Sequence, residues 1–150
     1  MLRDNKGITL IALTITIIVL LIIAGITISG GRESVKMSQS NKLLAELDMV
    51  QHACLERYAE YKLTKNENLL IGTQIEYSVA KTLANQMGYT DDFPEEGTFY
   101  ELNPENSEVM QSLGISNIED TYIVNYENGI VMNKTTTETP LGKALYKKEN

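Results

Sequence analysis

The chain has 150 residues, which fits one domain better than two, and its 20 acidic residues outnumber 13 basic ones for a net charge of −7. The acid is concentrated in residues 63–133, which carry twelve Asp or Glu but only two basic residues. Nucleic-acid binding depends on Lys and Arg to neutralise phosphates, so this composition argues against a nucleic-acid partner. The single cysteine, Cys54, excludes an internal disulfide. Stability must therefore come from the core or from assembly with other chains.

The first thirty residues contain a long apolar run, with no charged residue from Gly7 through Gly31. A helix over this run spans roughly 37 Å, enough to cross the hydrocarbon core of a bilayer. Its polar side chains are the hydroxyls of Thr9, Thr14, Thr16, Thr27 and Ser29. These hydroxyls can bond to a carbonyl one turn earlier and so cost little in lipid. The run is longer than the apolar core of a secretory signal peptide, about 7–15 residues. We therefore expect a membrane-inserted helix.

The order of residues at the start of this run is more specific than its hydropathy. Residues 6–13 read KGITLIAL and closely resemble the cleavage region of prepilins, the precursors of type IV pilins and type II secretion pseudopilins. In that family a membrane peptidase cuts after the Gly that ends a short basic leader, and the new terminus is often methylated. The resemblance implies that Gly7 ends the leader and that Ile8 starts the mature chain. A residue without a side chain lets an extended backbone enter a protease cleft.

The next residues, the assembly helix of the family, match its pattern except at one position. The matching residues are Thr9, Leu10, Ile11 and Leu13. The fifth mature residue is usually Glu, whose carboxylate is thought to offset the charged amino terminus of a neighbouring subunit, and here it is Ala12. An unpaired ammonium buried in a filament core is costly. The resemblance therefore implies a minor or tip subunit. The helix-kinking proline common in the family is also absent, and residues 29–31 (SGG) stand in its place.

The helical pattern continues beyond the apolar run. Residues 32–62 contain no proline, and apolar side chains recur there at steps of three and four: Leu43, Leu47, Val50, Cys54, Tyr58 and Tyr61. This spacing is typical of one face of an amphipathic helix that packs on a small head. One helix from Ile8 to Lys62 would be roughly 80 Å long. Two helices broken at Gly30–Gly31 are the alternative.

Cys54 lies on this apolar stripe, so we interpret it as a small buried hydrophobe. The only histidine, His52, points about 200° away on an ideal helix and is no activating base for the thiol.

A second helix is predicted to start at Thr73. Thr73 and Glu76 have the spacing of a capping box, and Gly88 is well placed to end the helix. Apolar residues recur within it every four positions, at Ile75, Val79, Leu83 and Met87.

The rest of the head is predicted to contain short strands and one short helix. Residues 98–102 are typical of a strand, and Asn103 is expected to cap a helix that opens at Pro104 and closes at Gly114. Residues 121–126 and 130–132 predict a β-hairpin around a type I′ turn at Asn128–Gly129. The segment YIVNYENG resembles hairpins in the heads of pilin-like proteins of Gram-positive bacteria. The composition of residues 134–150 favours a flexible tail.

The loop after the second helix contains four acidic residues, Asp91, Asp92, Glu95 and Glu96. They are weak candidates for calcium, which takes several oxygen ligands. Their spacing lacks the regularity of a known calcium loop, so we expect a solvated acidic turn and no metal. The sequence contains no catalytic constellation, and we expect neither a cofactor nor enzymatic activity.

Together these patterns predict an α+β protein. Its parts are a leader (1–7), an apolar transmembrane or filament-core helix (8–31), an amphipathic continuation (32–62), a head (63–133) and a tail (134–150). The resemblance implies a structural subunit, of the minor kind, in a type IV pilus-like filament or in a secretion or competence pseudopilus. It implies three partners: a prepilin peptidase, other pilin or pseudopilin subunits and a membrane assembly platform. The chain would begin in the cytoplasmic membrane and end at the cell surface. The alternative is an uncleaved single-pass membrane protein that displays a small extracellular binding domain.

Overall fold

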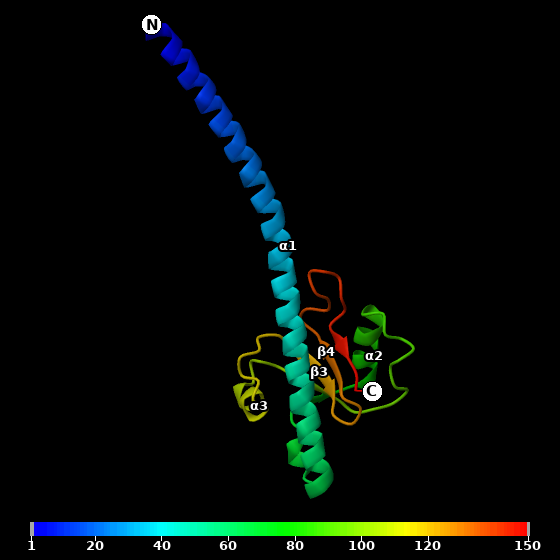
Figure 1. Ribbon diagram of the computed structural model, residues 1–150. Helices are drawn as coiled ribbons and strands as arrows, with labels where there is room; N and C mark the ends of the chain where they lie inside the picture. The colour runs from blue at the N-terminus through cyan, green and yellow to red at the C-terminus, as the bar shows by residue number, and fades with distance from the viewer. Residues whose placement is uncertain (1, 150) are drawn as a thin grey trace. The chain divides into compact units, whose positions relative to one another are not determined.

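A computed structural model describes residues 2–149, with the side chains of residues 2–6 and 29 left out of the description. The chain divides into two units after Ser38. The elements are α1 (Leu2–Thr64), a 3-10 turn (Glu67–Leu69), β1 (Thr73–Ile75), α2 (Tyr77–Gln86), β2 (Phe99–Leu102), α3 (Ser107–Ser112), β3 (Tyr122–Asn125), β4 (Ile130–Asn133) and β5 (Tyr146–Lys147) (Figure 1). This confirms the predicted α+β fold.

Helix α1 is one helical element through Gly30–Gly31, so the alternative of two helices is wrong. A Cβ added at either glycine would meet no atom within 4 Å. Both glycines therefore lie on an open part of the helix, where they carry only the intrinsic cost of Gly relative to Ala.

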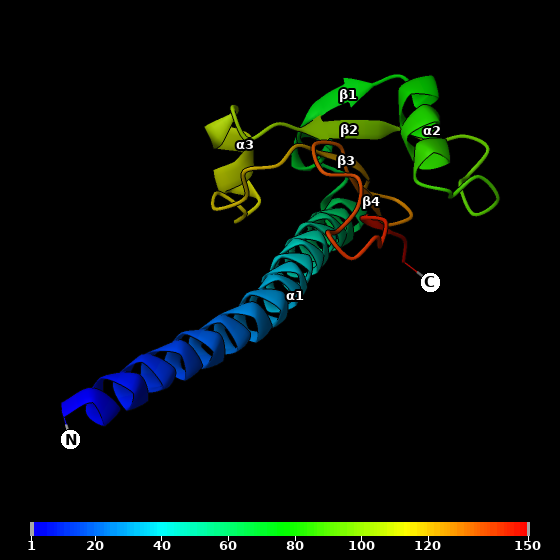
Figure 2. The ribbon, with the colours of Figure 1, turned by 90° about the horizontal axis from the view of Figure 1, so that it is seen from above.

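The second unit, which begins at Gln39, is built on a five-stranded antiparallel sheet in the order β1-β2-β3-β4-β5. Helices α2 and α3 lie at opposite ends of β2 (Figure 2). Successive side chains of a strand point to opposite faces, which divides the core into two clusters. Tyr122 and Val124 pack with Leu47, Val50 and Cys54 of α1. The residue between them, Ile123, packs with Ala80 and Leu83 of α2. The sheet is thus covered by α1 on one face and by α2 on the other.

The apolar stripe predicted on α1 is confirmed as core. Leu47, Val50 and Cys54 are buried, and Leu43 and Tyr58 pack against the same cluster while half-buried. His52 is exposed.

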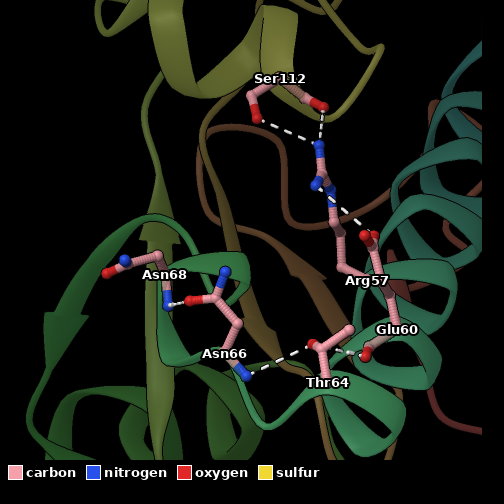
Figure 3. Close-up of polar contacts among 6 residues, drawn as sticks. All are labelled: Arg57, Glu60, Thr64, Asn66, Asn68 and Ser112. Atoms are coloured by element: carbon pink, nitrogen blue, oxygen red, sulfur yellow. Dashed lines mark hydrogen bonds and ion pairs between the residues drawn. The ribbon is translucent and has the colours of Figure 1, made fainter.

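The carboxyl-terminal part of α1 is bonded to α3 by one side chain. Arg57 of α1 donates to the carbonyl oxygen of Ser112 and, at 3.1 Å, to its hydroxyl (Figure 3). Arg57 thereby binds a free carbonyl at the carboxyl end of α3.

The prediction for the start of the second helix is wrong. Residues Thr73–Ile75 form strand β1, which pairs with β2, and α2 begins at Tyr77 with Glu76 as its amino-terminal cap and no side-chain cap bond. Hydrogen bonds to β2 satisfy backbone N–H and C=O groups of residues 73–75. A capping box at Thr73 is therefore not needed to satisfy them. Of the residues that recur every four positions, Leu83 and Met87 are buried and Val79 is exposed, while Ala80 and Ala84 take the other inward positions. Gly88, with φ +85°, follows the last turn as predicted.

The predicted start of the short helix is wrong in two respects. Helix α3 begins at Ser107 and not at Pro104, and its cap is Asn106, whose Oδ1 accepts from the Val109 N–H. Asn103 Oδ1 accepts from Glu105 N–H in the preceding turn. Gly114 closes that helix with φ +71°, as predicted.

The hairpin β3–β4 is confirmed, but its turn is not type I′. Asn125 pairs with Ile130, so the connection has the four residues 126–129, and only Gly129 has a positive φ (+62°). A type I′ turn needs positive φ at both central residues. Asn125 Oδ1 instead accepts from the N–H groups of Glu127 (3.0 Å) and Asn128 (3.3 Å), which stabilises the longer turn.

The predicted tail is packed onto the head over the residues that the structure describes. Strand β5 pairs with β4, and Leu145 is fully buried in the cluster under α1. The connection is anchored by Asn133, whose Oδ1 accepts from Thr136 N–H at 2.8 Å. Residues 134–149 therefore complete the head, and the head is longer than the predicted 63–133.

Burial of Cys54 predicts that the head loses stability in alkali. Burial raises the pKa of this thiol from 9.0 to about 12. The unfolded chain releases the proton above pH 9 while the folded chain holds it, so the stabilisation is complete below pH 9 and is lost as the pH rises toward 12. At pH 11 the loss is about 2–3 kcal/mol of unfolding free energy.

Urea unfolding between pH 8 and pH 11 measures this loss. Burial also raises the pKa of Tyr122 and Tyr126, which steepens the decline further into alkali. In Cys54→Ala the decline should be shallower, since the thiol is gone. An identical pH dependence in Cys54→Ala and the unmodified chain would contradict the prediction.

Candidate functional site

The apolar part of α1 is the candidate site, and the described chain has this one helix that is long and apolar enough to cross a membrane. Its large apolar side chains between Ile8 and Ile28 are 46–70% exposed. A monomeric soluble protein rarely exposes a contiguous apolar patch of more than a few hundred Å². This surface therefore requires lipid or another protein chain around it.

Three of the predicted hydroxyls, those of Thr14, Thr16 and Thr27, are satisfied one turn earlier in the helix, as predicted, and the Ser29 side chain lies outside the described ones. Thr14 Oγ1 donates to the Leu10 carbonyl at 2.9 Å, and Thr16 Oγ1 donates to the Ala12 carbonyl at 2.8 Å. Thr27 Oγ1 makes the same bond to Ile23 at 2.8 Å. Each of these three hydroxyls thus has a hydrogen-bond partner within the helix. A polar group in the hydrocarbon core of a bilayer needs such a partner, because no water is available there.

The predicted processing residues lie within the first turns of α1. Gly7 is helical, and a Cβ added there would meet no atom within 4 Å. Ile8 is exposed on the helix surface. A protease that cuts an extended backbone must unwind this turn, and Gly lowers that cost by about 1 kcal/mol relative to Ala. The preceding leader side chains, residues 1–6, lie outside the described ones.

The assembly residues predicted after the processing point share this exposed helix. Leu10, Ile11 and Leu13 are each at least 60% exposed, so all are available for contacts with other chains or lipid. Ala12 lies among them, and no carboxylate occurs anywhere between Gly7 and Gly31. This stretch of helix therefore has no acidic side chain that could neutralise the charged amino terminus of a neighbouring chain.

The one thiol of the head is not activated, and no metal centre is found among the described side chains. The Cys54 thiol is buried and its pKa is raised, so it stays protonated at neutral pH. Among the described side chains, those of residues 7–28 and 30–149, no group of three or more His, Cys, Asp or Glu is arranged to hold a metal ion. The four acidic candidates Asp91, Asp92, Glu95 and Glu96 are exposed in their loop.

Sequence reasoning missed a polar cavity in the head, at the carboxyl end of α1. It is lined by tyrosines from three segments, Tyr58 and Tyr61 of α1, Tyr100 of β2 and Tyr126 of the β3–β4 turn. The sequence predicted Tyr58 and Tyr61 only as part of the apolar stripe, and Tyr100 and Tyr126 only as strand residues. No local pattern marks such a site, because strand pairing brings its residues together.

Comparisons with protein-family models, with curated proteins and with solved structures find no match. The functional argument therefore depends on the residues of this chain.

Proposed function

We propose that this chain is a structural subunit of a type IV pilus-like filament or of a secretion or competence pseudopilus. The observation that carries the proposal is an exposed apolar helix that opens with a prepilin-like Gly7–Ile8 junction and continues into the sheet-packing helix of a small head. In the membrane, lipid covers residues 8–31. In the filament, the same helices of neighbouring subunits replace that lipid.

The experiment that tests this function is the determination of the mature amino terminus by mass spectrometry in cells that contain a prepilin peptidase. Processing gives a chain that begins at Ile8, with a methylated amine. A mature chain that retains residues 1–7 supports the second candidate, an uncleaved single-pass membrane protein that displays the head.

Ala12 leads to a prediction about copy number. A charged terminus buried without a partner costs several kcal/mol, and the membrane helix of this chain supplies no acid to offset it. We therefore expect a minor or priming subunit, present in few copies per filament. Quantitative mass spectrometry of purified filaments measures the ratio to the companion subunits. Finding this chain as the bulk component would contradict the minor-subunit proposal.

A further inference from the structure

The tyrosine-lined cavity in the head is a second candidate site that the filament proposal does not use. It has a volume of about 350 Å³ and is lined chiefly by Tyr58, Tyr61, Tyr100, Tyr126, Asn125 and Glu127. Small-molecule pockets measure about 300–1,000 Å³. Four of the eight tyrosines of the chain thus meet at one cavity of ligand size.

The four rings form two pairs. Tyr58 and Tyr61 stack along α1, with ring centroids 5.8 Å apart and planes at 26°. Tyr100 and Tyr126 meet edge to face at 5.3 Å and 71°. The Tyr126 hydroxyl donates to the Ile71 carbonyl at 2.5 Å, which fixes that ring. Tyr58, Tyr61 and Tyr100 are half-buried and present ring surface to the cavity, whereas Tyr126 is 2% exposed and packs against Tyr100.

The α1 side of the cavity is held in place by bonds on either side of the tyrosine pair. Before the pair, Arg57 is bonded to Ser112 (Figure 3). After it, Thr64 Oγ1 donates to the Glu60 carbonyl at 2.9 Å and accepts from Asn66 N–H at 3.4 Å. A wall fixed before binding reduces the entropy that a ligand must offset.

The cavity concentrates hydrogen-bonding groups that have no protein partner. Within the described chain, the hydroxyls of Tyr58, Tyr61 and Tyr100 make no hydrogen bond, and the Glu127 carboxylate makes neither a hydrogen bond nor an ion pair. Asn125 uses its Oδ1 for the turn, which leaves its Nδ2 as a donor. Burial raises the pKa of Tyr58 and Tyr100, so their hydroxyls remain donors at neutral pH. The site thus presents both donors and acceptors beside aromatic rings.

This combination fits a sugar ring, whose C–H face packs on an aromatic ring while its hydroxyls both donate and accept. An organic cation fits less well, because two ammonium groups already lie over the α1 rings: Lys62 Nζ is 4.9 Å from the centroid of Tyr58, and Lys65 Nζ is 5.9 Å from that of Tyr61. We expect the sugar to pack on Tyr100, over which no ammonium group of the described residues lies. We propose that this cavity binds a pyranose sugar unit of a glycan. The proposal holds whether or not the chain is a filament subunit.

Saturation-transfer NMR on the full chain in polyoxyethylene detergent micelles, which carry no sugar headgroup, tests the proposal. The probes are the methyl glycosides of glucose, galactose, mannose and N-acetylglucosamine, with choline chloride as the cationic probe. We expect at least one glycoside to receive saturation from the protein, with a Kd on the order of 1 mM, typical of a site with few contacts. We expect no transfer to choline.

Two variants tie this signal to the cavity while preserving its shape. Tyr100→Phe removes a hydroxyl, and Glu127→Gln removes a negative charge and replaces one acceptor oxygen with an NH2 donor. Each change should weaken binding about 3–10-fold. Tyr89→Phe is the matched control, since it removes a hydroxyl from a ring that stacks on Tyr146 outside this cavity. Transfer to no glycoside, transfer to choline alone, or glycoside affinity unchanged in both cavity variants would overturn the proposal.

Discussion

Replacement of Leu47 by alanine is expected to lower the unfolding free energy of the head by about 2–5 kcal/mol. Leu47 is 3% exposed and packs in the cluster that joins α1 to the sheet. Truncation removes apolar contacts and leaves a cavity, and both effects act in the same direction. Chemical unfolding of a soluble fragment from residue 32 onward measures the loss. This fragment keeps the whole core, because every buried residue of the described chain lies at Ser40 or later.

Met49→Ala is the matched control, since Met49 lies two positions along the same helix and is 41% exposed. It should cost only about 0.5 kcal/mol, as surface substitutions usually do. If Leu47→Ala leaves the fragment as stable as the unmodified one, this face of α1 is not the core of the head and serves instead as an inter-subunit surface.

Replacement of Gly7 by leucine is expected to abolish amino-terminal processing. The folded chain itself tolerates the change, because a Cβ at position 7 meets no atom within 4 Å. The effect arises in the peptidase, where a leucine side chain prevents the close approach of an extended backbone that glycine permits. Mass spectrometry should find the variant entirely in its precursor form and filaments that lack it.

Gly25→Leu provides the control for this experiment. Gly25 lies in the same helix, and a Cβ there also meets no atom within 4 Å, so the two variants add the same side chain in equally open surroundings. We expect Gly25→Leu to be cut at the normal position. Normal cutting of Gly7→Leu, or equal loss of cutting in both variants, would show that Gly7 is no recognition residue for a prepilin peptidase.

Local patterns in the sequence determined the long helix α1 of this protein. The uncharged run from Gly7 to Gly31 specifies a membrane-length helix, and the three-and-four spacing of the stripe that includes Leu47 and Cys54 specifies a helix face. The β-rich residues 121–126 likewise predicted a strand whose hairpin partner follows directly. These features were predictable because they depend on neighbours within a few residues.

Features that depend on distant partners were decided only by the tertiary structure. Thr73–Ile75 has the local spacing of a helix start, yet it forms a strand because β2 supplies hydrogen-bond partners more than twenty residues away in sequence. Leu145 follows a threonine-rich segment that predicts a flexible tail, yet it is buried because the cluster under α1 has a place for its side chain. The tyrosine cavity arises in the same way, since sheet pairing and helix packing place Tyr58, Tyr100 and Tyr126 on its walls. Long-range pairing and burial outweigh a local preference worth only about 1 kcal/mol per residue, and no short window of sequence contains them.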